Sequence, residues 1–334
     1  MDFSRYVWLA VVALFALEST PSSAQGTLVL ANIGYENSGF VAPAVLMVRA
    51  TRSNDSRWTI GLVGTNLLAE WERIANPRWS TLVRGDVVWR NANMSDFIYT
   101  RGLRDESREY RNRTVRLTGA VRFRPSTRWT AEVRAIGLYE FVDEIANTAV
   151  SELWDAPYAG LGVALAYRHV LSDDVLQFRW DGLKASTETT VFVGPETWVK
   201  SQTWIGVGTR AGPVFFHGSG WLLLGRNLNI VTRHLVGGSW DLAPRPILYG
   251  YHFGEFRLDR ALVANGGMDV RLAGAWEIGI RAGYLSSPSE TTYGEAIRLG
   301  SVWQGVAFYG GLGFPEGVGN DAVGFVWMSL ALLQ

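Results

Sequence analysis

The stretch Thr114–Phe141 reads TVRLTGAVRFRPSTRWTAEVRAIGLYEF and contains two alternating segments joined by a turn. In both segments apolar or small residues fill every second position, and most of the positions between them are charged or polar. Successive side chains of a β-strand point to opposite faces, so each segment has an apolar, aromatic face and a face with charges of both signs. The intervening RPST, residues 124–127, is typical of a turn. The stretch therefore predicts an antiparallel hairpin.

The same alternation recurs along the chain, whereas an amphipathic helix of ordinary length does not. Around the segment 269–284, Asp269, Arg271, Glu277 and Arg281 share one parity, and apolar residues share the other. Further candidate strands are Leu28–Tyr35, Val41–Ala50, Trp58–Leu67, Thr81–Arg90, Ala159–His169, Thr203–Ala211, Trp221–Val231, Leu299–Trp303, Val306–Phe314 and Ala322–Leu332.

Two all-β architectures produce many alternating strands. In a soluble secreted sandwich the apolar face is the core, whereas in a membrane barrel it meets lipid and the polar face lines a lumen. Many candidate strands suit a tilted membrane span, and the 15 Trp and 12 Tyr include many near strand ends, as in an interfacial belt. The polar segment Met94–Arg113 is typical of an external loop. These features favour a transmembrane antiparallel β-barrel, with the secreted β-sandwich as an alternative.

The N-terminus predicts export. Arg5 precedes the apolar run Tyr6–Leu17, which is too short to span a bilayer, and Ser22-Ser23-Ala24 resembles a signal-peptidase site. We expect a cleaved signal peptide over residues 1–24, one barrel domain over 25–334, and a location in the outer membrane of a Gram-negative bacterium. The candidate strands start almost at the cleavage site, so we expect no preceding periplasmic repeat domains.

Composition excludes several classes of function. The 31 basic and 31 acidic residues balance, which gives no large field for binding nucleic acid. The chain has no cysteine and therefore no disulfide or thiolate metal site, and its histidines lack metal-ligand spacing. We expect no metal, no cofactor and no enzymatic activity.

A second stretch carries a family resemblance. LVGGSWDLAPRPILYGYHFGEFRLDRALVANGGMDVRL, Leu235–Leu272, places a glycine pair before a glycine-aromatic motif, a charged segment and a strand. This order resembles the barrel signature of the BamA/TamA-type outer-membrane assembly and secretion superfamily, the bacterial surface antigen family. The resemblance implies about sixteen strands and a loop folded into the lumen. The implied loop residues are Tyr249, Gly250, Tyr251, Gly254, Glu255, Phe256, Arg257, Asp259 and Arg260, and the implied lumen wall includes Arg271, Glu277 and Arg281.

Two departures concern the ion pair that usually fixes this loop. Tyr249 stands where the family has an arginine before the glycine, and Arg281 stands where the wall offers an aspartate. A lock of this kind would need another pair, for which we expect Arg257 with Glu277.

The remaining expectations concern chemistry and partners. His217 and Ser219 have the His-x-Ser spacing of outer-membrane lipid hydrolases, which leaves such an enzyme as an alternative, but a glycine-rich turn over Phe216–Gly220 is favoured. Paired wall charges are the favoured role of the lumen arginines Arg116, Arg122, Arg134, Arg271 and Arg281, and anion or lipopolysaccharide binding is the alternative. The expected function is protein insertion, secretion or solute passage, with outer-membrane lipids, lipopolysaccharide and client proteins as partners.

Overall fold

The computed structural model describes residues 27–36, 41–42, 45–53, 55–63, 66–88, 96–100, 103–143, 155–174, 179–229, 232–238, 246–252, 254–272, 274–303, 306–316 and 322–333. This described part is all-β, and its large sheet contains sixteen long antiparallel strands and two short ones. The predicted signal peptide, residues 1–24, lies outside it. No helix in these ranges is long and apolar enough to cross a membrane.

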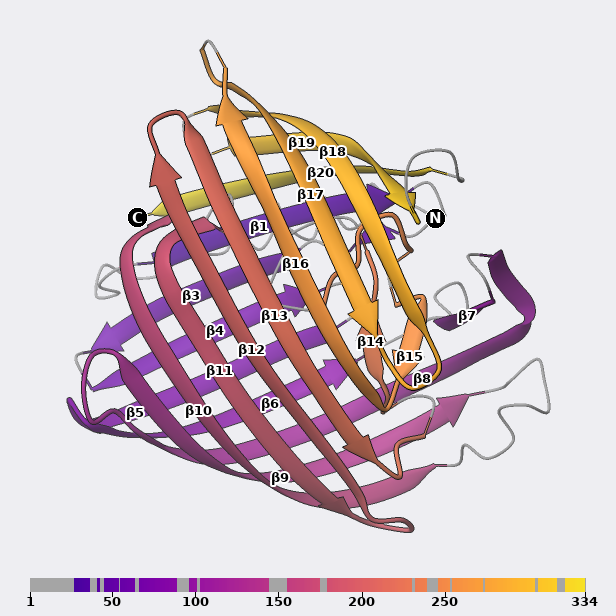
Figure 1. Ribbon diagram of the computed structural model, residues 1–334. Coiled ribbons are helices and arrows are strands. Elements are labelled where there is room, and N and C mark those ends of the chain that lie inside the picture. Colours follow the sequence, from indigo (N-terminus) through magenta and orange to yellow (C-terminus); the bar gives the residue numbers. More distant parts are fainter. Residues whose placement is uncertain are drawn as a thin grey trace.

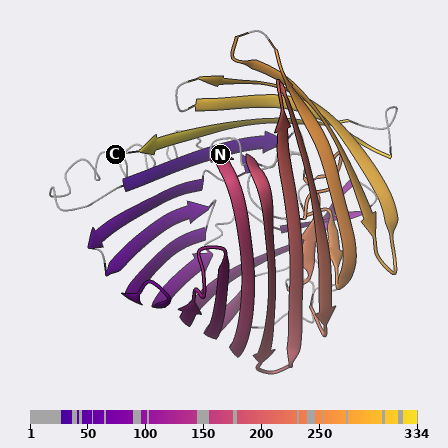
Figure 2. The same cartoon turned by 60° about the vertical axis from the view of Figure 1, so that its left-hand side comes forward.

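The strands of the large sheet follow one another in chain order around a lumen (Figures 1 and 2). They are β1 (Thr27–Glu36), β3 (Val45–Ser53), β4 (Ser56–Val63), β5 (Asn66–Asn76), β6 (Trp79–Val88), β8 (Leu103–Phe123), β9 (Trp129–Asp143), β10 (Ala156–Asp174), β11 (Arg179–Val193), β12 (Trp198–Ala211), β13 (Val214–Arg226), β16 (Arg260–Arg271), β17 (Trp276–Ser286), β18 (Thr291–Trp303), β19 (Val306–Pro315) and β20 (Val323–Leu333). Short additional strands are β2 (Val41–Ala42), β7 (Asp96–Thr100), β14 (His234–Val236) and β15 (Phe256–Leu258).

The first and last strands of the sheet pair with each other. β1 lies antiparallel to β20, with a register that runs from Leu28 opposite Leu333 to Glu36 opposite Phe325. Both views show the two strands side by side (Figures 1 and 2). Every strand of the ring therefore has a partner on each side, as the interior of a bilayer requires of a strand structure. The soluble sandwich considered from the sequence is not the fold.

The outer surface is apolar along its length. On β9, Val133 is 60% exposed, whereas the neighbouring Glu132 is 8% exposed and faces the lumen. Such outward apolar side chains next to inward charged ones are typical of a barrel in lipid. The alternation predicted for Thr114–Phe141 is confirmed by this pattern.

Aromatic side chains mark one rim of the barrel. They come from strand ends beside the short connections and include the pairs Trp79 with Phe123 and Trp129 with Tyr167, whose ring centroids lie 4.5 and 4.8 Å apart. Short turns of outer-membrane-type barrels face the periplasm, and aromatic rings favour the membrane interface. We therefore call this rim the periplasmic rim; the opposite rim carries the long connections, including the one between β13 and β16.

The structure corrects several boundaries predicted from the sequence. β5 and β11 were not among the candidate strands, and the candidate Trp58–Leu67 divides into the end of β4 and the start of β5. The segment Met94–Arg113 is not simply a loop, because β7 pairs with an extension of β8 beyond the strands of the barrel wall (Figure 1). Phe216–Gly220 is not a turn: it lies within β13 and pairs with both β12 and β16.

The register between β1 and β20 can be tested by an engineered disulfide, because the chain has no cysteine. Ile33 faces Met328 across the two strands. Facing residues of antiparallel strands have Cα atoms about 4.5–5.5 Å apart, which a disulfide can bridge. We expect Ile33→Cys with Met328→Cys to cross-link on oxidation, as seen by a reductant-sensitive shift in gel mobility. Ile33→Cys with Val326→Cys is the control; equal cross-linking of both pairs would contradict the register.

Candidate functional site in the barrel lumen

The connection between β13 and β16 folds into the lumen and packs on its wall. Within it, β14 pairs with β15, and both strands lie inside the ring (Figure 1). Leu248, which is fully buried, packs in a cluster with inward residues of the wall such as Trp221, Val263 and Leu285. The lumen-folded loop that the family resemblance implied is therefore present.

Tyr249 is buried against the last strands of the barrel. Its side chain is 2% exposed and packs in a cluster with Ile247, Tyr309, Phe325 and Trp327. Tyr249 thus makes an apolar contact with β19 and β20. The free energy of this contact comes mainly from burying the aromatic ring.

Glycines allow the loop backbone to approach the wall closely. A Cβ atom at Gly294 of β18 would lie 1.7 Å from the carbonyl oxygen of Tyr249. Gly250 has φ of +82°, a conformation that favours glycine, and a Cβ there would lie 2.3 Å from the backbone carbonyl carbon of Phe314. These positions admit no side chain without moving the loop or the wall.

Hydrogen bonds attach the same segment to two wall strands, β16 and β18. The amide of Asn265 on β16 donates to the carbonyl of Ile247 at 3.0 Å. The hydroxyl of Tyr251 is hydrogen-bonded to the Thr292 hydroxyl on β18 and donates to the carbonyl of Tyr293 at 3.3 Å. Burial raises the pKa of Tyr251, so this phenol remains protonated at neutral pH.

The two acids of the loop motif make contacts within the connection itself. Glu255 accepts from the backbone N–H of His252 at 2.9 Å, and Asp259 pairs with Arg233 at 3.2 Å. Phe256 stacks edge-on against Tyr251, with ring centroids 5.0 Å apart. The rest of the motif is placed as follows: Gly254 has φ of +67°, Arg257 lies in β15 opposite Leu235, and Arg260 is exposed at the start of β16.

His234 of β14 is a neutral part of this connection. Its ring nitrogen Nε2 lies 3.1 Å from the carbonyl of Leu224. Burial and the positive charge of Lys200 lower the pKa of His234 to about 4. The side chain therefore acts as a hydrogen-bonding group at neutral pH.

A buried ion cluster lies in the wall near the periplasmic rim. Asp269 of β16 accepts from Arg281 at 2.8 Å and from Arg298 at 2.9 and 3.1 Å, and it pairs with Arg179 at 2.8 Å. Glu277 binds Arg179 and accepts from the hydroxyl of Tyr309. The side chains of all the charged members are 2–7% exposed. We call Arg179, Asp269, Glu277, Arg281, Arg298 and Tyr309 the wall cluster.

Arg179 joins distant parts of the ring in this cluster. It begins β11, and β12 and β13 lie between that strand and β16. Its guanidinium carbon lies 5.4 Å from the ring centroid of Phe215 on β13, within cation–π range. The side chain therefore passes over two strands and fastens the end of β11 to β16 and β17.

Glycines leave space for the charged side chains of the wall cluster. Gly279 lies between Asp269 and Arg298 in one row across β16, β17 and β18, and a Cβ there would lie 2.1 Å from the Asp269 carboxylate. Gly267 faces Arg281 in the next row, where a Cβ would lie 2.7 Å from the arginine side chain. Because glycine has no side chain, Gly279 and Gly267 leave space in which the carboxylate and the guanidinium groups can contact each other along the wall.

A second line of ion pairs covers the opposite part of the lumen. Arg122 of β8 bridges Glu72 of β5 and Glu132 of β9, at 2.9 and 2.8 Å. Arg134 of β9 binds Glu132 and reaches Glu188 of β11 at 3.0 Å. Alternating acids and arginines thus cross the wall from β5 to β11, which gives this side a charged, hydrated surface.

The sequence named only part of these sites. Glu277 and Arg281 are buried in the wall as expected of lumen residues, whereas Arg271 is exposed at the end of β16. The partners that the structure gives Glu277 are Arg179, Arg298 and Tyr309 instead of the expected Arg257. Arg298 and Tyr309 occupy lumen-facing positions in the alternating pattern of their strands, so the sequence could have predicted them as lumen residues. No sequence signal places Arg179 beside β16. Of the other lumen arginines, Arg116 lies exposed on the same face of β8 as Arg122.

His217 and Ser219 both face the lumen. They share parity with Phe215 and Trp221, which are 6% and 4% exposed, and alternate with the outward Phe216. Both side chains are therefore turned away from the lipid. No group of acids and histidines that could hold a metal ion occurs among the described residues.

No protein-family model and no curated protein sequence matches the chain. Solved structures do share the fold. BamA from Haemophilus ducreyi lacking POTRA domains 1–3 aligns with a TM-score of 0.66 and 8% identity, over 92% of this chain and 70% of that chain. CdiB from Acinetobacter baumannii aligns with a TM-score of 0.56 and 10% identity, over 92% and 60%. CdiB from Escherichia coli aligns with a TM-score of 0.56 and 11% identity, over 91% and 63%. The chain spans less than two thirds of both CdiB chains, and these similarities show the fold.

Gly294→Ala should displace the loop. The new methyl group would occupy the space of the Tyr249 carbonyl, so the loop must leave the wall or strain it. We expect faster proteolytic cleavage within the segment 239–258 while the barrel keeps its heat-modifiable gel mobility. Gly85→Ala, where a Cβ meets nothing within 4 Å, is the matched control. Unchanged cleavage in Gly294→Ala would contradict the docked position of the loop.

Asp269→Asn should destabilise the barrel by about 3–5 kcal/mol, because removing one partner leaves buried arginines uncompensated. The midpoint of urea unfolding in detergent micelles measures this change. The double variant Asp269→Asn/Arg281→Gln also lacks one of the uncompensated arginine charges, so it should regain part of the lost stability. Asp173→Asn is the control, since its pairs with Arg168 and Lys184 are partly exposed at the periplasmic rim. An equally small effect of Asp269→Asn and Asp173→Asn would contradict a structural role for the wall cluster.

Proposed function

We propose that this chain is an outer-membrane barrel of the BamA/TamA-type superfamily that takes part in the insertion or secretion of proteins, without enzymatic activity. The observation that supports this proposal is the connection between β13 and β16, which occupies the lumen and packs on β16 to β20. The order of its glycine, aromatic and charged residues is the part of the sequence that resembles the superfamily. The shared fold with BamA and CdiB chains agrees with it.

The position of the loop suggests how it would serve such a function. Tyr249 packs on Phe325 and Trp327 of β20, the strand that closes the ring with β1. The loop therefore supports one side of the β1–β20 seam from within the lumen. Protein clients that insert through a barrel wall would need this seam to open, whereas the rest of the ring stays paired.

Solute passage is the second candidate function. The ion pairs from Glu72 to Glu188 line the side of the lumen away from the β16–β20 wall, which supports a hydrated path there. Client proteins and lipopolysaccharide remain proposed partners. The inward orientation of His217 and Ser219 supports a non-enzymatic role, because a lipid hydrolase must bring its nucleophile to the lipid.

The seam disulfide provides the test. Purified Ile33→Cys/Met328→Cys barrel in liposomes is mixed with an unfolded eight-stranded outer-membrane barrel protein, and folding of that client is followed by its heat-modifiable gel mobility. We expect the reduced protein to accelerate client folding at least about threefold over liposomes holding an unrelated sixteen-stranded porin, and oxidation to remove the acceleration.

The same preparation distinguishes two opposing outcomes. Acceleration that persists after oxidation would refute a role for the seam. No acceleration, together with ion conductance in a planar bilayer that oxidation leaves unchanged, would overturn the assembly proposal in favour of solute passage. The Ile33→Cys/Val326→Cys pair controls for the cysteines themselves.

A further inference from the structure

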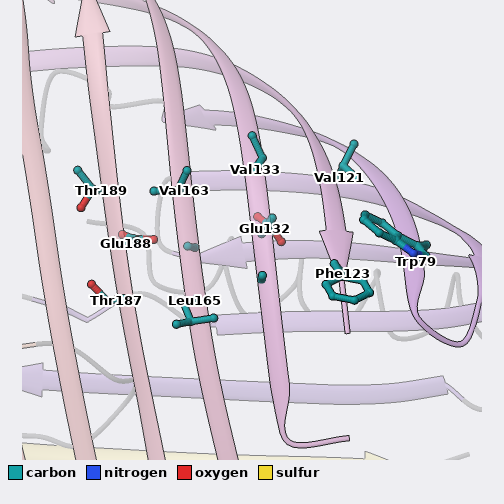
Figure 3. Close-up of a pocket in the computed structure, with 12 residues that line it drawn as sticks. Trp79, Val121, Phe123, Glu132, Val133, Val163, Leu165, Thr187, Glu188 and Thr189 are labelled. Carbon is teal, nitrogen blue, oxygen red and sulfur yellow. The ribbon is translucent and has the colours of Figure 1, made fainter. Parts of the chain in front are cut away.

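The lipid-facing surface has a groove of about 350 Å³ near the periplasmic rim. Figure 3 shows Val121 and Phe123 on one side of it, Val163 and Leu165 on the other, and the strand with Val133 between them. Glu132 and Glu188 also line the groove, although both belong to the lumen-facing side of the wall. The exposed lining is otherwise almost entirely apolar.

A small outward residue on β9 makes this groove. Ala131 lies between the larger Phe123 of β8 and Leu165 of β10, so it forms a recess between them. Val133, the next outward residue of β9, lies between Val121 and Val163 and lines the groove on the side toward the bilayer. An extended hydrocarbon chain fits such a groove better than the surrounding convex surface.

The aromatic pairs at the rim fix the depth of the groove. Trp79 lines the groove and stacks on Phe123, and Trp129 with Tyr167 lies one outward position closer to the rim than Ala131 and Leu165. Aromatic rings of this kind lie at the level of lipid headgroups. The groove therefore opens at the headgroup level and continues into the acyl region.

Two arginines at that rim have no ion-pair partner among the described residues. Arg78 and Arg128 are exposed in the turns that precede Trp79 and Trp129, and within the described part of the chain no carboxylate pairs with either. Their backbones are held in place, because the Arg78 carbonyl accepts from Arg124 and the Arg128 carbonyl accepts from Arg168. Arginine near a membrane surface attracts anionic lipid phosphate.

The other rim arginines on these strands are already paired. Arg124 donates to Glu72 at 2.7 Å, and Arg168 pairs with Asp173 at 2.6 Å. The hydroxyl groups beside the groove are also satisfied, since Thr187 bonds Thr203 at 2.9 Å. The uncompensated charge at the mouth of the groove thus belongs to Arg78 and Arg128.

We propose that this groove binds an anionic phospholipid of the periplasmic leaflet. One acyl chain lies along Ala131 and Val133, and the phosphate lies between Arg78 and Arg128. The site rests on the proposed outer-membrane location and is independent of a role in protein insertion. A bound lipid here would fix the β6–β10 side of the barrel at a defined depth.

Native mass spectrometry of the purified barrel in detergent, titrated separately with phosphatidylglycerol and phosphatidylcholine of equal chain length, tests the site. For the wild-type chain we expect one phosphatidylglycerol to bind about tenfold more tightly than phosphatidylcholine, the preference that two rim arginines supply. Arg78→Gln/Arg128→Gln should reduce the preference to less than about twofold. Ala131→Phe should fill the groove and weaken binding of both lipids.

The control and the opposing outcomes use the same instrument. Arg210→Gln, an exposed arginine at the end of β12, should leave the preference unchanged. Equal binding of the two lipids by the wild-type chain, or an unchanged preference in Arg78→Gln/Arg128→Gln, would overturn the proposal. A dimer in place of lipid adducts would instead identify a second copy of the chain as the occupant. Retained heat-modifiable mobility shows that each variant is folded, and the liposome assay for client folding reads the proposed function separately.

Discussion

The pairing of β1 with β20 is the interaction on which the rest of the structure depends. A strand edge inside a bilayer leaves backbone N–H and C=O groups without water, at a cost of several kcal/mol for each group. Closing the ring removes both edges at once, and the alternating sequence then sorts side chains between lipid and lumen. The charged residues that an apolar environment would exclude become the lining of the interior. Everything found inside the barrel follows from this separation of two environments.

Two sets of contacts with different chemistry stabilise the interior of the barrel: the ion pairs of the wall cluster and the contacts of the loop. The wall cluster pairs Asp269 and Glu277 with arginines from β11, β17 and β18, while the loop is held by Tyr249, by hydrogen bonds and by close backbone contact at Gly294. A buried ion cluster resists the removal of any one member, because the remaining charges lose their compensation. The loss of an apolar contact leaves no isolated charge behind. The wall is therefore expected to be the more rigid of the two, and the loop the part that can leave its position.

The sequence predicted the β-barrel architecture but only some residues of the candidate site. Periodic patterns such as that of Thr114–Phe141 record which face of a strand meets lipid, so the barrel was predictable from them. β11 was missed because its outward face carries threonines among its apolar residues, including Thr187 and Thr189, which weakens the alternation. The loop was found through a spaced motif. The partner of Glu277 was not, because Arg179 reaches it across strands that are far apart in the chain, and no local pattern records such a contact.

Tyr249 explains why the contacts of the loop and the ion pairs of the wall cluster are separate. Tyr249 brings no cation to the wall at this position, so arginines of the wall itself compensate the wall acids. Arg281 of β17 supplies one of them to Asp269 on the neighbouring strand. These ion pairs therefore lie within the wall and not between loop and wall. The ion pairs of Asp269 and Glu277 are made with other wall residues and do not involve Tyr249, whereas Lys200 of β12 donates to the carbonyls of Thr232 and Arg233 in the connection. We therefore expect the ion pairs of the β16–β18 wall to persist when the segment around Tyr249 is displaced.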